Sequence, residues 1–144
     1  MFTSVNSRAA SAYKRVSADT GVSTADPHQL VVMLFDGLMQ SLNAAHGAME
    51  RGEIEAKGQA IGKAVRILEE GLKAGLNMAQ GGELAKNLNG LYGYAAQRLT
   101  MANLRNDRAL VTEVIGLIEP VADSWKQIKG QRPAHLQPVL GQGA

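Results

Sequence analysis

Apolar residues recur every three or four positions along most of this chain, which is the spacing that places them on one face of an α-helix. Three interruptions divide the pattern into four stretches of similar length, at about 27–50, 53–80, 83–105 and 107–129. Short turns join these stretches. The pattern therefore predicts an all-α fold, an antiparallel four-helix bundle in which each helix buries one apolar stripe.

Helix-capping residues support the first boundaries. Asp26 precedes Pro27 and is followed three positions later by Gln29, as in a capping box with proline at the first helical position. Gly52 is expected to end this helix, and the pair Gly81–Gly82 is expected to break the next one. The first helix is therefore predicted to begin at Pro27.

The fourth helix allows more than one interpretation at two places. Either Asn106 or Asp107 caps its start. Pro120 lies inside the helix and removes the amide that would bond to the carbonyl of Gly116, so the helix either bends there or ends and restarts. A glycine and a proline beyond its last apolar residue are expected to stop it near Lys129.

The bundle is expected to occupy residues 23–130, with a different kind of segment on either side. In residues 1–22, Tyr13 and Val16 share one side of a short predicted helix with an alanine at position 9 or 10. We interpret this segment as a mobile N-terminal cap, and the alternative is an arm that packs permanently on the bundle. The tail, residues 131–144, is expected to be disordered.

Several helices carry a second apolar stripe, offset by one position from the first. One stripe per helix is enough to close a bundle, so the additional apolar surface either widens the core or binds a partner in a groove. For the fourth helix taken as a whole, we favour the groove. The residues of these second stripes are Ile67, Ala74, Met78, Met101, Leu104, Val111, Ile115, Ile118, Ala122 and Trp125.

Composition narrows the classes of function. The sequence contains no cysteine, which excludes disulfides, thiolate metal sites and cysteine nucleophiles. Fifteen basic and thirteen acidic residues give a formal net charge of +2 with interspersed signs, which does not favour a nucleic-acid partner. No stretch has the apolar length of a membrane span, and the first ten residues lack the apolar segment of a signal peptide. We therefore expect a cytoplasmic protein.

The sequence shows no arrangement typical of catalysis or cofactor binding, so we expect neither an enzyme nor a bound cofactor. No histidine has a glutamate three positions before it, as a di-iron bundle requires, and neither His28 nor His46 is followed by the residues typical of phosphotransfer domains. His46 and Glu50 stand one helical turn apart, but two ligands alone make a poor metal site. Asp36 and Arg98 could form a structural pair between the first and third helices.

Short motifs spread along the chain resemble those of the flagellin-specific export chaperones called the FliS family. The resemblance covers about Ser7 to Ile128, and it lies in the order and spacing of the motifs rather than in any single one. The motifs are Ala12-Tyr13, Thr24-Ala25-Asp26-Pro27-His28-Gln29-Leu30, Met33-Leu34-Phe35-Asp36-Gly37, Gly81-Gly82-Glu83-Leu84, Leu91-Tyr92-Gly93-Tyr94, Arg98-Leu99, Ala102-Asn103-Leu104-Arg105-Asn106-Asp107 and Trp125-Lys126-Gln127-Ile128.

This resemblance implies a cytoplasmic chaperone that binds the disordered C-terminal segment of flagellin, prevents its premature polymerisation and assists its export through the flagellar secretion apparatus. The flagellar export gate would be a second partner, and an anti-sigma factor or a co-chaperone is left open as a third. The alternative function is a helical adaptor that binds another flagellar or regulatory protein.

The resemblance also implies where the partner binds. Tyr13 would belong to a movable cap, Leu104 and apolar residues of the fourth helix would form the groove, and Asn103 would supply a polar contact. Together with the second stripe, this predicts a partner-binding set composed of Tyr13, Val16, Asn103, Leu104, Val111, Ile115, Ile118 and Ala122.

Overall fold

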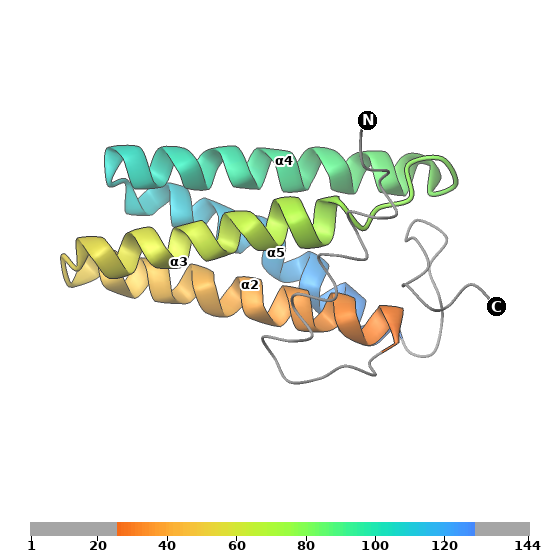
Figure 1. The fold of residues 1–144 in the computed structure, drawn as a ribbon, viewed down its shortest axis with the longest axis horizontal. Coiled ribbons are helices and arrows are strands. Elements are labelled where there is room, and N and C mark those ends of the chain that lie inside the picture. The colour runs from red at the N-terminus through yellow and green to blue at the C-terminus, as the bar shows by residue number, and fades with distance from the viewer. Residues whose placement is uncertain (1–25, 129–144) are drawn as a thin grey trace, which may run out of the picture.

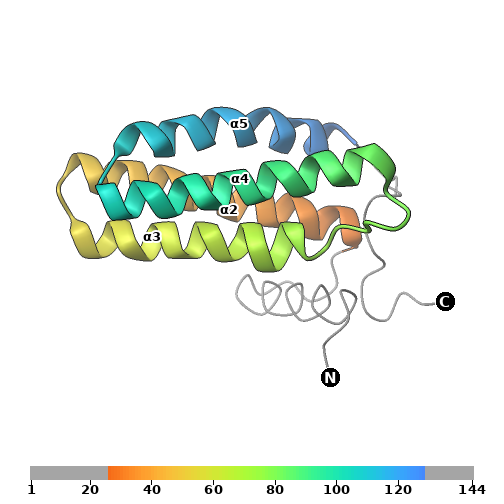
Figure 2. The same cartoon turned by 90° about the horizontal axis from the view of Figure 1, so that it is seen from above.

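The computed structural model describes residues 26–128, which fold into an antiparallel bundle of helices (Figures 1 and 2). This confirms the predicted all-α class and the four-helix architecture. The predicted N-terminal cap with Tyr13 and Val16, and the predicted tail at 131–144, lie outside the described residues. The helices are α2 at Pro27–Glu50, α3 at Ile54–Arg66 with a π-helical continuation, η1, at Ile67–Lys73, α4 at Gly82–Arg105 and α5 at Arg108–Gln127.

Each helix of the bundle packs against two neighbours. Helices α3 and α5 both contact α2 on one side and α4 on the other, so α2 and α4 face each other diagonally across the core (Figure 1). Phe35 of α2 and Tyr92 of α4 meet along this diagonal with their ring centroids 6.3 Å apart, and both side chains are buried. The core therefore runs along the bundle axis between all four helices.

The first helix begins and ends where the sequence predicts. The Asp26 carboxylate accepts a hydrogen bond from the Gln29 amide at 2.7 Å, and the Gln29 side-chain oxygen accepts one from the Asp26 amide at 3.1 Å. These two bonds complete the predicted capping box. After the last turn, Gly52 adopts a left-handed conformation with φ of 71°, which glycine reaches without steric cost.

The second helix differs from its prediction, because it does not continue as an α-helix to Gly81–Gly82. It becomes π-helical at Ile67, and the chain then turns at Asn77, whose side-chain oxygen accepts a hydrogen bond from the Gln80 amide at 3.1 Å. Buried leucines continue through the change, so the apolar spacing does not reveal it. An asparagine side chain that bonds to the backbone three residues later favours a turn over further helix.

The fourth helix resolves both alternatives left by the sequence. Asp107 is the N-cap of α5 and accepts a hydrogen bond from the Ala109 amide at 3.0 Å, whereas Asn106 ends α4 in a left-handed conformation. Helix α5 continues through Pro120, so the alternative of a helix that ends and restarts is wrong. Pro120 and Gly116 are both exposed, and water can therefore reach the carbonyl that lost its amide partner.

Candidate partner-binding surface

Two of the predicted partner-binding residues lie in the last turn of α4. Asn103 and Leu104 are both exposed, and Leu104 is the most exposed large hydrophobic residue of the described chain, at 82%. A second exposed apolar side chain, Ile54, begins α3 at the same end of the bundle and is 73% exposed. This end therefore presents apolar side chains to solvent without a covering element among the described residues.

Most of the predicted set on α5 is instead part of the core. Val111, Ile118 and Ala122 are buried, as is Trp125, so these side chains do not line an exposed groove in this structure. The physical reason is that α5 packs against both α2 and α4, and a helix with two neighbours buries two apolar flanks. Ile115 is half-buried and packs against this core. Contact of the three buried residues with a partner stays a prediction, and it requires a rearrangement that uncovers them.

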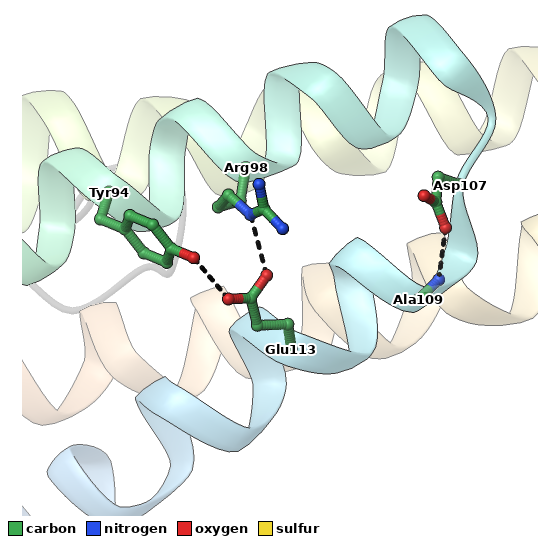
Figure 3. Close-up of polar contacts among 5 residues, drawn as sticks. All are labelled: Tyr94, Arg98, Asp107, Ala109 and Glu113. Atoms are coloured by element: carbon green, nitrogen blue, oxygen red, sulfur yellow. Dashed lines mark hydrogen bonds and ion pairs between the residues drawn. The ribbon is translucent and has the colours of Figure 1, made fainter.

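Polar side chains join α4 to α5 beside this surface (Figure 3). The Glu113 carboxylate of α5 accepts a hydrogen bond from the Tyr94 hydroxyl at 2.5 Å and forms an ion pair with the Arg98 guanidinium at 2.8 Å. Tyr94 and Arg98 stand one turn apart on α4, and the guanidinium lies 5.6 Å from the centre of the tyrosine ring. One carboxylate thus holds two neighbouring side chains of the opposite helix.

These contacts shift the pKa values of Glu113 and Tyr94 in opposite directions. The hydrogen bond from Tyr94, followed by that from Arg98, lowers the pKa of Glu113 because both stabilise its charged form. The same hydrogen bond raises the pKa of Tyr94, since the phenol must keep its proton to donate it to Glu113. Around neutral pH the pair is therefore a neutral phenol that donates to a charged carboxylate.

The end of α4 is also contacted from α3. The Lys57 ammonium donates hydrogen bonds to the backbone carbonyl of Asn103 at 3.2 Å and to the side-chain oxygen of Asn106 at 3.3 Å. Lys57 is only 6% exposed, which is unusual for a lysine. Its contacts connect the first turns of α3 to the turn that carries Asn103 and Leu104.

The predicted pair between Asp36 and Arg98 is wrong. Asp36 pairs with Lys126 of α5 at 3.1 Å, and Arg98 pairs with Glu113 of the same helix. Because α2 and α4 are diagonal in the bundle, charges on their outer flanks reach α5 before they reach each other.

The histidines of the described chain make structural contacts. One ring nitrogen of His28, Nε2, lies 2.6 Å from the backbone carbonyl of Trp125, and the two rings are 5.8 Å apart. The His46 ring lies 3.8 Å from the Glu50 carboxylate within α2. In residues 26–128 we find no group of three or more histidine, cysteine or acidic side chains suited to hold a metal ion. Within the same range, no helix has the length and apolar character needed to span a membrane.

Fold and surface together define an all-α bundle that exposes several large apolar side chains. Comparison with known proteins places this bundle in a family. The family model described as "Flagellar protein FliS" matches residues 9–132, and the chain therefore belongs to the FliS family.

Curated relatives agree with this assignment. The chain is 50% identical to the flagellar secretion chaperone FliS of Salmonella typhimurium, in an alignment that covers 81% of this chain and 87% of the relative. It is 40% identical to the protein of the same name from Vibrio cholerae, over 81% of this chain and 85% of the relative. It is also 45% identical to the flagellar secretion chaperone FliSB of Pseudomonas aeruginosa, over 81% and 91%.

Sequence reasoning missed two features of this surface. Lys57 was not singled out, although it lies between Ile54 and Ile61 on the apolar stripe of α3, where a lysine must either leave the core or find a partner. The contact of Tyr94 with Glu113 has no comparable signal, because it depends on which helices are neighbours.

Proposed function

We propose that this chain is a cytoplasmic chaperone that binds the C-terminal segment of flagellin, prevents its premature polymerisation and assists its export through the flagellar secretion apparatus. The observation that carries the proposal is membership of the FliS family, with relatives named flagellar secretion chaperones. The flagellar export gate would receive the loaded chaperone. A regulatory role, with an anti-sigma factor or co-chaperone as additional partner, would use the same bundle. No step of this function requires catalysis.

Leu104 is the proposed centre of the partner-binding surface on the described chain. An exposed leucine in the last turn of a helix gains about 1.5–3 kcal/mol when a partner buries it fully, which corresponds to roughly a 10- to 150-fold gain in affinity. Asn103 beside it offers an amide that can donate to and accept from a partner backbone. Ile115 would extend the apolar contact from α5, and Tyr13 and Val16 remain proposed members of a cap that competes for it.

An amphipathic partner segment suits this surface better than a preformed domain. The exposed apolar side chains belong to different helices, among them α3 and α4, and a segment that folds on binding can contact several of them. Its ordering cost reduces the net affinity, which favours release of the cargo during export.

Calorimetric titration with a peptide that covers the flagellin C-terminus tests the proposal. Leu104→Asp replaces an exposed side chain and should leave the bundle folded while it lowers affinity by about tenfold or more. Leu84→Asp is the matched control, because Leu84 is an exposed leucine at the opposite end of the same helix, roughly 30 Å away.

The outcomes separate the candidate functions. Tight binding by wild type and by Leu84→Asp, with loss in Leu104→Asp, supports the proposed surface. Binding by Leu104→Asp as tight as that of wild type would move the surface elsewhere on the bundle. No binding by wild type would overturn flagellin as the partner and favour the alternative, an adaptor for another flagellar or regulatory protein.

A further inference from the structure

Lys57 is a buried, charged side chain that does not belong to the proposed partner-binding surface. Its side chain crosses from α3 to α4, where the ammonium donates to the Asn103 carbonyl and to the Asn106 side chain. Burial of a charged amine is unfavourable unless hydrogen bonds replace its hydration. At 6% exposure, Lys57 therefore depends on these two acceptors, which both belong to the end of α4.

The end of α4 needs such a donor. The last four carbonyls of a helix have no amide partner within it, and they carry the negative end of the helix dipole. The amides of Asn106 and Asp107 both donate to the carbonyl of Ala102, and the distance from the Asp107 nitrogen to that oxygen is 3.0 Å. The next carbonyl, that of Asn103, accepts from Lys57 instead. A cation at this position gives the Asn103 carbonyl a hydrogen-bond donor and also complements the dipole.

Other contacts hold the α5 side of the turn between α4 and α5, but they do not replace Lys57. Asp107 caps α5, and Arg108 at the start of α5 forms an ion pair with Glu50 of α2 at 3.4 Å. Both contacts hold the start of α5. Lys57 is the side chain that reaches the α4 side, where Asn103 and Leu104 are carried.

We propose that Lys57 is a positioning residue for partner binding: its ammonium caps α4 from the neighbouring helix and holds the turn that presents Asn103 and Leu104. This inference rests on the proposed function, and it adds a residue that does not itself touch the partner. Leu104 is almost fully exposed, so its own packing contributes little to fixing the last turn of α4. The Lys57 ammonium holds this turn in place through its hydrogen bonds to Asn103 and Asn106.

Hydrogen exchange tests the capping step without any partner. Lys57→Met keeps a long apolar stem in the stripe of α3 but removes the ammonium, and Lys63→Met is the matched control because Lys63 is exposed on the same helix. In Lys57→Met, exchange of the Asn106 and Asp107 amides should accelerate at least about tenfold, the factor expected for loss of a charge-assisted hydrogen bond. Exchange in the core of α4 should not change.

A double-mutant cycle tests the link to binding. Lys57→Met should lower affinity for the flagellin C-terminal peptide by roughly fivefold, because the peptide must then order the turn as it binds. When Leu104 is already alanine, the same substitution should have almost no further effect, since the residue that it positions is gone. A merely structural lysine would give additive losses instead.

The outcomes distinguish this inference from the proposed function. Unchanged exchange at Asn106 and Asp107 in Lys57→Met, or additive losses in the cycle, would overturn the role of Lys57 alone. No peptide binding by wild type would overturn the proposed function, and this inference with it. If Lys57→Met does not fold, Asn106→Gly removes one acceptor and tolerates the left-handed conformation at φ 53°; faster exchange at Asp107 then supports the proposal and unchanged exchange overturns it.

Discussion

Substitution by alanine at two glycines, one in α3 and one in η1, should change the free energy of unfolding in opposite directions. At Gly62 in α3, a Cβ atom would have no neighbouring atom within 4 Å outside the helix's own backbone. At Gly71 in η1, a Cβ atom would lie 2.8 Å from one terminal methyl of Leu34 and 3.3 Å from the other. Leu34 is 1% exposed, so the surrounding core restricts its movement.

The structure sets the size of each effect. Gly62→Ala gains helix propensity without a clash and should stabilise the protein by about 1 kcal/mol, which is roughly 3 °C in melting temperature for a chain of this size. Overpacking of a core typically costs about 1–3 kcal/mol, so after the gain of about 1 kcal/mol in propensity Gly71→Ala should lower the free energy of unfolding by up to about 2 kcal/mol.

Urea unfolding followed by circular dichroism measures both free energies. Gly58→Ala is a control, because a Cβ atom there also meets open space and the variant should behave like Gly62→Ala. A Gly71→Ala protein stabilised as much as Gly62→Ala would refute the close packing of η1 on α2. A destabilised Gly62→Ala protein would refute the assignment of an open helical site in α3.

Three further substitutions test the helix contacts. Asp107→Ala removes the N-cap of α5 and should lower the free energy of unfolding by about 1 kcal/mol, as measured in urea. Asp36→Asn removes an ion pair between half-exposed side chains and should change stability by less than about 0.5 kcal/mol in the same assay. The lowered pKa of Glu113 means that its contribution to stability is present above pH 4.5, the usual pKa of a glutamate, and is lost as pH falls through the lowered value. The difference in urea midpoint between wild type and Glu113→Gln should therefore shrink as pH falls below 4.5, and a difference that grows would contradict the arrangement in Figure 3.

The sequence was sufficient to predict the helices and most of their ends. The capping box at Asp26 and the glycine at position 52 are local signals, which the sequence shows directly because they act within one turn of backbone. The π-helical segment was not predictable in this way, since Leu68 and Leu72 fit the apolar spacing of an ordinary α-helix as well.

The surface was harder to predict than the helices. A second apolar stripe on α5 is consistent with either an exposed groove or a second buried flank, and only the packing of α5 between α2 and α4 decides that Val111 and Ile118 are buried. The failed pairing of Asp36 with Arg98 has the same cause, because spacing along a helix says which residues share a face but not which helix that face meets.

Flagellin polymerisation in the presence of this protein tests the central claim most directly. Seeded assembly of purified flagellin would be followed by light scattering with equimolar wild type, Leu104→Asp or Leu84→Asp protein. A chaperone that covers the flagellin C-terminal segment should suppress elongation, Leu84→Asp should suppress it equally, and Leu104→Asp should suppress it much less. Elongation at the same rate with and without the wild-type protein would contradict the account.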